Sequence, residues 1–301
     1  MRTLVTLAVV LVVAAALAPS ARADGGPSPG ASFDPTGITD GRRFTYATTQ
    51  AGNLSSLVVR DRTGRMVRSR TFDGLYGIPY VTFGGAKAGL SRDGRRLVVA
   101  RAATGGHVLA RSSRLLVLDT ATLRTRQAID LPGDFSFDAL SPDARTLFLI
   151  QHSSATDYER YRVRAYDLER HRLRPDAIVD RTEPNMRGFP MARLVGPGGT
   201  WVYTFYLHQG GEPFVHALDT VHAQARCLDV EWDGKEKVLW SAHLELDAGK
   251  LDVVGKYGHR IATLELEHPS SSGFATGWTA GGAAAALALT SLFLMHRRRR
   301  V

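Results

Sequence analysis

The sequence predicts an all-β fold made of repeated antiparallel sheets, placed between two apolar terminal segments. Three observations carry this prediction. A polar turn followed by a short apolar β-type run occurs five times at nearly equal intervals. Four of these repeats contain a second β-type run that ends in aspartate. Finally, the long apolar stretches lie only at the two ends, so the middle of the chain has the composition of a folded domain.

The first apolar stretch has the pattern of a secretory signal peptide. Residues 1–23 contain an early arginine, then a run of Leu, Val and Ala, and they end in Ala21-Arg22-Ala23. Small residues on either side of one position are typical of a signal-peptidase site. Residues 24–37, rich in Gly, Pro and Ser, are expected to be a flexible lead-in. The folded part is therefore expected to be exported.

The second apolar stretch predicts a membrane anchor. Residues 274–295 are 22 residues without a charge, enough to cross about 30 Å of hydrocarbon. Residues 268–273 are then a stalk, and residues 296–301 a basic cytoplasmic tail that orients the helix by the positive-inside rule. The alternative is a sorting signal that is cut off, although no LPxTG motif precedes it. The stop-transfer arginines are Arg297, Arg298, Arg299 and Arg300.

The charge balance argues against a nucleic-acid partner. The chain carries 38 Lys and Arg against 29 Asp and Glu, a net charge of +9. Six of the basic residues and none of the acids lie in the terminal segments, which leaves 32 basic against 29 acidic groups in the exported part. Such a surface is nearly neutral. Cys227 is the only cysteine, so no internal disulfide can form, and a buried, inert thiol is expected.

The five repeats set the period of the fold. In each copy an apolar residue stands four positions after an Asp, or after the Gly198 that replaces it, and the intervals between these positions are 53, 50, 55 and 49. A period near 50 with short strands indicates a propeller or a related array. The apolar runs lack polar alternation, which suits strands buried on both faces. The turn residues are Asp40, Asp93, Asp143, Gly198 and Asp247.

A second mark completes the repeating unit. Four β-type runs end in Asp61, Asp119, Asp167 and Asp219, and each leads through a short polar turn into another β-type stretch. The repeating unit is thus a four-stranded antiparallel blade. Its elements follow in the order strand, Asp turn, strand, loop, strand ending in Asp, turn and strand. Residues 38–267 are thus predicted to form a β-propeller of about five four-stranded blades.

Part of the chain resembles a known repeat. Residues 114–150 resemble the YVTN-type β-propeller repeat, which is similar in style to WD40-like and TolB-like exported bacterial propellers. The matching text is LVLDTAT at 116–122, IDLPG at 129–133 and LSPD at 140–143. The resemblance implies a fold and no particular function. Such rings commonly have seven blades, so either this one closes with five or an open arc pairs with a partner. The fifth unit lacks its terminal strand, and residues 31–34 are placed to complete it.

No catalytic, cofactor-binding or metal-ligating residue is assigned, and no cofactor is expected. One Asp per repeat supplies too few oxygens for calcium, and capping its own turn explains each Asp. No HExxH, CxxC, G-x-S-x-G or phosphate-loop pattern is present. The paired glycines are interpreted as flexible loop positions.

The long connections are the best candidates for binding. Residues 71–88, 151–160, 180–191 and 206–214 carry aromatic and charged side chains, which suit protein or glycan contact at a propeller end face. The alternative is that about half of these aromatics pack between blades. We therefore expect a single-pass, extracytoplasmic binding or scaffold module with a protein or cell-envelope partner. The alternative function is an extracytoplasmic lactonase-like or quinone-cofactor dehydrogenase-like enzyme with its site at the channel mouth. Candidate partner-binding residues are Tyr76, Tyr80, Arg187, Phe189, Tyr206 and His208.

Overall fold

The computed structural model describes residues 30–103, 109–157, 159–182, 186–232 and 239–266. The predicted leader, stalk, membrane span and basic tail lie outside these residues. In the part that is described, no helix has both the length and the apolar character needed to cross a membrane.

The described chain is all-β and consists of five antiparallel sheets, numbered here 1 to 5 in the order of their turn motifs. Sheet 1 contains β2 (Ile38–Thr39), β3 (Thr45–Ala51), β4 (Leu54–Arg60) and β5 (Met66–Asp73). Sheet 2 contains β1 (Ala31–Ser32), β6 (Tyr76–Pro79), β7 (Arg96–Arg101), β8 (Ser112–Asp119) and β9 (Thr125–Pro132). Sheet 3 contains β10 (Asp134–Leu140), β11 (Thr146–His152), β12 (Tyr161–Asp167) and β13 (Arg172–Ile178).

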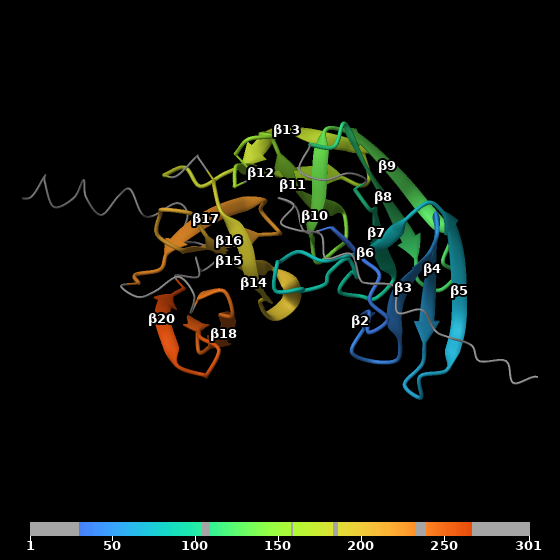
Figure 1. Cartoon of the computed structure of the whole chain (residues 1–301), viewed down its shortest axis with the longest axis horizontal. Helices are drawn as coiled ribbons and strands as arrows, with labels where there is room; N and C mark the ends of the chain where they lie inside the picture. The colour runs from blue at the N-terminus through green and yellow to red at the C-terminus, as the bar shows by residue number, and fades with distance from the viewer. Residues whose placement is uncertain (1–29, 104–108, 158, 183–185, 233–238, 267–301) are drawn as a thin grey trace, which may run out of the picture.

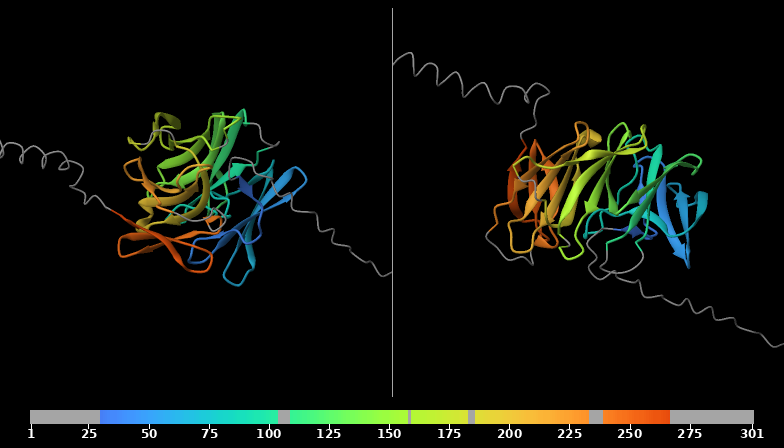
Figure 2. Two further views of the ribbon diagram at one scale, coloured as in Figure 1. Left: turned by 60° about the vertical axis from the view of Figure 1, so that its left-hand side comes forward. Right: turned by 90° about the horizontal axis from the view of Figure 1, so that it is seen from above.

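The last two sheets follow the same plan. Sheet 4 contains β14 (Phe189–Val195), β15 (Trp201–Leu207), β16 (Phe214–Asp219) and β17 (Gln224–Asp229), and a 3-10 turn, η1 (Pro197–Gly199), precedes β15. Sheet 5 contains β18 (His243–Asp247), β19 (Lys250–Val254) and β20 (Arg260–Glu265). The predicted four-stranded, propeller-like blades are thus present, with three described strands in the fifth. Figures 1 and 2 show the sheets following one another in chain order along an arc.

The prediction for residues 31–34 was wrong. Ala31 and Ser32 do not complete the fifth sheet. They form β1, which pairs with β6 of sheet 2 through Ala31 opposite Pro79 and Ser32 opposite Ile78. Thr48 of the neighbouring sheet fixes this strand, since its hydroxyl donates to the Ser32 carbonyl at 2.5 Å. The terminal strand therefore strengthens the start of the array instead of joining its two ends.

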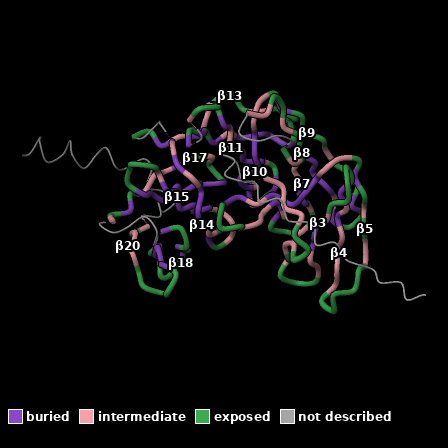
Figure 3. The backbone as a smooth tube through the Cα atoms, in the orientation of Figure 1, coloured by how far each residue is buried: buried purple, intermediate pink, exposed green. Residues whose placement is uncertain are grey.

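Each interior strand packs into two hydrophobic cores, one on each face of its sheet, as its unbroken apolar run predicts. In β7, Leu97 packs between sheets 1 and 2, whereas Val98 packs between sheets 2 and 3. In β11, Leu149 faces sheet 2 and Phe148 faces sheet 4. Figure 3 shows the buried backbone passing through the middle of the sheets, with exposed segments at their ends. Apolar side chains on both faces of a strand exclude water from two interfaces at once.

Sheet 5, the last sheet of the array, is polar on its free face. Leu244, Val253 and Ala262 lie in one row across sheet 5 and pack against sheet 4. The opposite face carries Asp252, whose carboxylate lies 2.9 Å from Arg260 and accepts a 2.6 Å hydrogen bond from Thr263. Among the described residues, four buried clusters join successive sheets, and none of them joins sheet 5 to sheet 1.

The aspartates act as turn caps, as the sequence predicts. One Asp40 oxygen accepts hydrogen bonds from the backbone N–H groups of Arg42, Arg43 and Phe44 at 2.7–3.0 Å. Similar bonds to Asp93, Asp143, Asp61, Asp119, Asp167 and Asp219 hold six further turns. In sheet 2, where β1 is an additional strand, these turns join β6 to β7 and β8 to β9. In the other sheets they join the first strand to the second or the third to the fourth, so all of them lie at one end of the array. We call this end the turn end, and the opposite end the loop end.

The chain that connects β6 to β7 in sheet 2 crosses the middle of the molecule. Residues 80–88 form a small hairpin, closed by the Ala88 N–H donating to the Pro79 carbonyl at 2.8 Å. At its tip, the N–H of Phe83 donates to the Pro190 carbonyl in β14 of sheet 4 at 2.8 Å. The Phe83 ring meets Phe189 edge-on, with 5.7 Å between ring centroids. The hairpin therefore connects two sheets that are not neighbours in the array.

Candidate functional site

Three of the predicted binding connections meet at the loop end of sheets 3 and 4. They join β11 to β12, β13 to β14 and β15 to β16. Arg160 and Arg187 form an isolated antiparallel bridge between the first and second connections. The N–H of Gly188 donates to the Glu159 carbonyl at 3.0 Å. Because backbone bonds link the connections directly, their side chains are presented as one surface, which we call the loop-end site.

Glu159 ties the third connection to the other two. Its residue is only 5% exposed, and one carboxylate oxygen accepts a 2.8 Å hydrogen bond from the backbone N–H of Gln209. The other oxygen lies 2.8 Å from Nδ1 of His208. A buried carboxylate requires hydrogen-bond donors, so the bond from the Gln209 N–H fixes where this connection lies on the surface.

The outer rim of the site is charged and accessible. Arg187 lies 3.1 Å from the carboxylate of Asp157, and its side chain is 40% exposed. Arg160 approaches the same carboxylate at 3.9 Å. Ion pairs at such an exposure contribute little to stability. Their donors and acceptors are consequently available to a partner at small energetic cost.

A buried ion pair lies beneath the rim, at the interface of sheets 3 and 4. Arg193 in β14 donates to the carboxylate of Asp138 in β10 at 2.6 Å and to the Asp138 carbonyl at 2.8 Å. Both side chains are about 5% exposed. Thr204 lies 3.4 Å from the same guanidinium. The pair is almost completely desolvated, so each partner depends on the other.

Aromatic stacking surrounds this pair. The rings of Tyr161 and Tyr206 stack with 4.9 Å between centroids, and Tyr206 stacks in turn on Phe214 at 5.2 Å. Burial raises the pKa of both tyrosine hydroxyls well above the ordinary value. The tyrosines are therefore neutral hydrogen-bonding groups, unable to act as bases near neutral pH.

Two buried histidines complete the cluster. Burial lowers the pKa of His152, although Asp134 nearby acts in the opposite direction. Burial also lowers the pKa of His216 to about 4; Asp138 opposes this shift and Arg193 reinforces it. Both rings are neutral at pH 7. The cavity lined by Asp138, His152, Tyr161 and Tyr206 has a volume of about 10 Å³, close to the space that a single water needs.

The predicted binding residues separate into three groups. Arg187 and His208 lie on the loop-end site. Phe189 and Tyr206 lie directly beneath it: Phe189 is partly buried against the 80–88 hairpin, and Tyr206 is buried in the tyrosine stack. Tyr76 and Tyr80 lie elsewhere. Tyr76 is buried against Phe72, with 5.6 Å between centroids, and Tyr80 pairs with Lys87 at the base of the hairpin.

Sequence reasoning missed the Asp138–Arg193 pair. The two residues are 55 positions apart, and no motif links them. The only signal is that Arg193 is a charge inside the otherwise apolar strand β14. Within the described ranges, no group of three or more His, Cys, Asp or Glu side chains is arranged to hold a metal ion. The Cys227 side chain is partly buried.

Comparisons with known proteins agree on the type of fold. Neither a protein-family model nor a curated protein matches the chain. Among solved structures, the Dos1 propeller is 14% identical, with a TM-score of 0.43 over 78% of this chain. TolB from Acinetobacter baumannii is 12% identical, with a TM-score of 0.44 over 77% of this chain. The Swd1 β-propeller domain of Myceliophteria thermophila is 11% identical, with a TM-score of 0.42 over 77% of this chain.

This chain spans 59%, 54% and 64% of the lengths of those three structures, respectively. The similarity to these structures is a distant one of fold alone. At this level of identity, function has to be argued from the site itself.

Proposed function

We propose that the protein is a membrane-tethered, extracytoplasmic β-propeller module that binds a protein or glycan partner through its loop-end site. One observation carries the proposal: three connections from two sheets are fixed into a single surface by Glu159, whose carboxylate contacts both Gln209 and His208. A surface that is ordered before binding loses less conformational entropy when a partner docks.

The composition of the site supports recognition of a polar partner. Arg187 and Asp157 offer a charged donor and acceptor pair on the rim, and His208, 28% exposed at its side chain, offers a ring edge beside them. Arginine and aromatic groups are the side chains on which binding energy concentrates in protein interfaces. The tether is supported by the apolar segment and its four arginines, which lie outside the described residues.

Site-specific cross-linking in native membranes tests the partner proposal. A photo-reactive side chain at Gln209, which is exposed and contacts Glu159 only through its backbone, should yield a defined cross-linked product. The matched control is the same probe at Met66, which is 60% exposed on the outer strand of sheet 1. Equal products from both positions, or none from Gln209, would contradict the proposal.

Topology has its own test. Mass spectrometry of the membrane-extracted protein should give a chain that starts at Asp24 and retains Arg297 to Arg300. A chain that keeps residues 1–23 would refute export by signal-peptide cleavage. A chain that lacks the arginines would mean that the C-terminal segment is a processing signal and not an anchor.

The enzyme alternative has one supporting observation, the buried set of Asp138, His152 and His216 with shifted histidine pKa values. Shifted groups in a cavity are typical of active sites. The volume of about 10 Å³ beside them weighs against this alternative, because substrate pockets are commonly some 300–1,000 Å³. Hydrolysis of lactones by the purified full chain, abolished by His152→Ala, would favour the enzyme over the binding module.

A further inference from the structure

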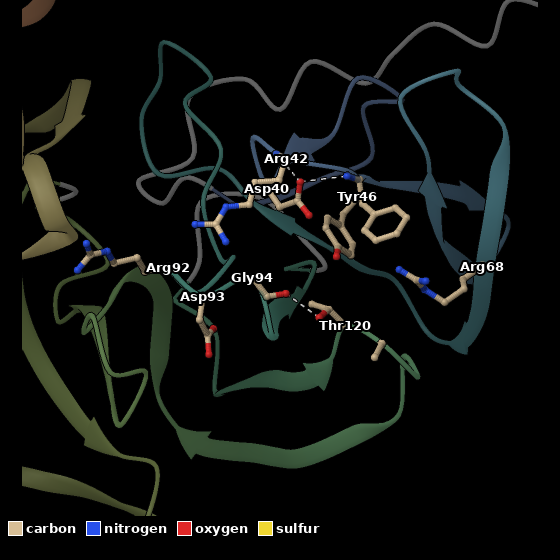
Figure 4. A pocket seen from close by; sticks show the side chains of 10 residues that line it. Asp40, Arg42, Tyr46, Arg68, Arg92, Asp93, Gly94 and Thr120 are labelled. Carbon is tan, nitrogen blue, oxygen red and sulfur yellow. Dashed lines mark hydrogen bonds between the residues drawn. The ribbon is translucent and has the colours of Figure 1, made fainter.

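A second cavity lies at the turn end, on the opposite side of the array from the loop-end site. It has a volume of about 190 Å³ and lies between the turns of sheets 1 and 2. Figure 4 shows that Arg42 and Arg68 enter it from sheet 1 on opposite sides of Tyr46, and that Arg92 comes from the Asp turn of sheet 2. Three arginines therefore line one small cavity, with the guanidinium of Arg92 at its edge beside Gly198 of sheet 4.

These arginines differ from the others at the turn end. Arg65, Arg126 and Arg170 lie in equivalent turns and pair with the strand-end aspartates Asp61, Asp119 and Asp167 at 2.5–3.1 Å. In contrast, none of the three cavity arginines forms an ion pair within the part of the chain that the structure describes. Their charges are left for a group from outside.

The two acids of the cavity are occupied by their own turns. One Asp40 oxygen accepts three backbone N–H groups. One Asp93 oxygen accepts the Ser91 hydroxyl at 2.7 Å and the Arg95 N–H at 3.0 Å. These carboxylates lower the positive potential of the cavity, but they form no ion pair with its three arginines in the described part of the chain. The formal charge of the five groups is still +1.

Two aromatic residues, Phe44 and Tyr46, complete the lining of the cavity. The first restrains the orientation of Arg68, and the second supplies a neutral hydrogen-bond donor. The guanidinium of Arg68 lies 4.5 Å above the centroid of the Phe44 ring, a cation–π contact that restrains its orientation. Its Nε atom is buried and has no hydrogen-bond partner among the described residues. Burial raises the pKa of the Tyr46 hydroxyl, against hydrogen bonds with Thr120 and Arg68. The hydroxyl therefore keeps its proton and can donate it.

We propose that this cavity binds an oxyanion, a phosphate or a carboxylate, carried by a small molecule or by the end of a larger one. Guanidinium groups match the planar, two-oxygen geometry of both anions. A volume of about 190 Å³ lies below the roughly 300 Å³ at which pockets for drug-sized ligands begin, so one charged group with a short attachment fits better than a complete cofactor. This proposal does not depend on the partner proposed for the loop-end site.

Titration of the detergent-solubilised full chain tests the site. Inorganic phosphate and glucuronate, each titrated at constant ionic strength, distinguish the two anions, and glucose is the uncharged control. We expect saturable calorimetric binding of at least one anion and none of glucose. Arg42→Gln and Arg92→Gln, both at exposed positions, should each weaken that binding about tenfold, as expected for the loss of one charged hydrogen bond.

Arg172→Gln provides the control, because Arg172 is an exposed arginine at the turn end of sheet 3, where β13 begins. It should leave anion binding unchanged. Arg68→Gln should weaken binding as well, and its circular dichroism spectrum separates this effect from misfolding. The proposal is overturned if neither anion binds saturably, or if Arg42→Gln, Arg92→Gln and Arg172→Gln all bind the anion as the unmodified protein does.

Discussion

Arg193 holds Asp138 twice across the interface of sheets 3 and 4, at 2.6 Å through the carboxylate and at 2.8 Å through the backbone carbonyl. The contact joins the inner strands of two neighbouring sheets directly below the loop-end site. A side-chain pair with both partners almost fully buried fixes the register of the sheets more strictly than apolar packing does, because neither charge tolerates the loss of the other.

Removal of one partner should therefore destabilise the protein strongly. We expect Arg193→Met to lower the free energy of unfolding by about 3–5 kcal/mol, because the Asp138 carboxylate then stays buried without its cation. Denaturant unfolding followed by fluorescence measures this change. The double variant Asp138→Leu/Arg193→Met should lose less than Arg193→Met alone. A loss in the double variant equal to the sum of the losses in Arg193→Met and Asp138→Leu would show that the charges are not coupled.

The contact between the 80–88 hairpin and β14 depends on a glycine. A Cβ atom at Gly84 would lie 2.6 Å from the Met191 carbonyl oxygen, which forces the hairpin tip away from sheet 4. Gly84→Ala should lower the free energy of unfolding by about 1–3 kcal/mol, the usual cost of overpacking. Gly30→Ala is the control, because its nearest contact would be a comfortable 3.9 Å. Similar stabilities of the two variants would refute the role of this contact.

Acidification should destabilise the fold before the carboxylates titrate. Burial holds the pKa of His216 at about 4 in the folded state, compared with roughly 6.5 for an unfolded histidine. Between these values the unfolded chain binds more protons, so the free energy of unfolding falls as the pH is lowered from about 6.5 towards 4. His152, with its pKa lowered in the same direction, adds to the effect.

The size and origin of this pH effect can be measured. By pH 5 the loss attributable to His216 should be on the order of 2 kcal/mol, seen as a lower denaturation midpoint. His216→Phe should flatten the profile between pH 7 and 5, whereas replacement of the exposed His171 should not. An unchanged slope in His216→Phe would mean that this ring is charged in the folded protein.

The turn aspartates should act through their oxygen atoms and not through a metal. Asp40→Ala leaves three backbone N–H groups without their acceptor, and a loss of about 1–2 kcal/mol is expected. Asp40→Asn keeps one carbonyl oxygen in place and should lose less. Thermal denaturation of both variants, with and without a calcium chelator, checks this. A lower midpoint of the unmodified protein in chelator would instead indicate a bound ion.

Much of the fold follows from local sequence. The turn at Asp93 and the apolar run beginning at Leu97 predict a strand and its cap from neighbours within a few residues, because hydrogen bonds in the turn and burial on both faces act at that range. The pairing of Ala31 with Pro79 could not be predicted in the same way. A two-residue strand has no periodicity, and its partner is chosen by tertiary contacts such as that with Thr48.

The sequence predicts which connections form the loop-end site, but it does not predict how their side chains are arranged in space. The position of His208 within a long polar connection marked it as a surface candidate. Its contact with Glu159 depends on how sheets 3 and 4 pack, which no pattern near either residue encodes. The end of the array did leave a signal in the sequence. The run Leu251-Asp252-Val253 alternates where the interior repeats are continuously apolar, because no other described sheet packs on the outer face of sheet 5.

Because its outer face is charged and not packed on another described sheet, sheet 5 is expected to be the mechanically weakest sheet of the array. Stability in a one-dimensional array is approximately a sum over nearest-neighbour contacts. Among the described residues, sheet 5 has three strands and packs only on sheet 4. In the tethered protein that we propose, this sheet is also the one that joins the bilayer. A pull between the membrane and a docked partner would then reach the weakest module first, so sheet 5 would peel away while the loop-end site, held by sheets 3 and 4, stayed assembled.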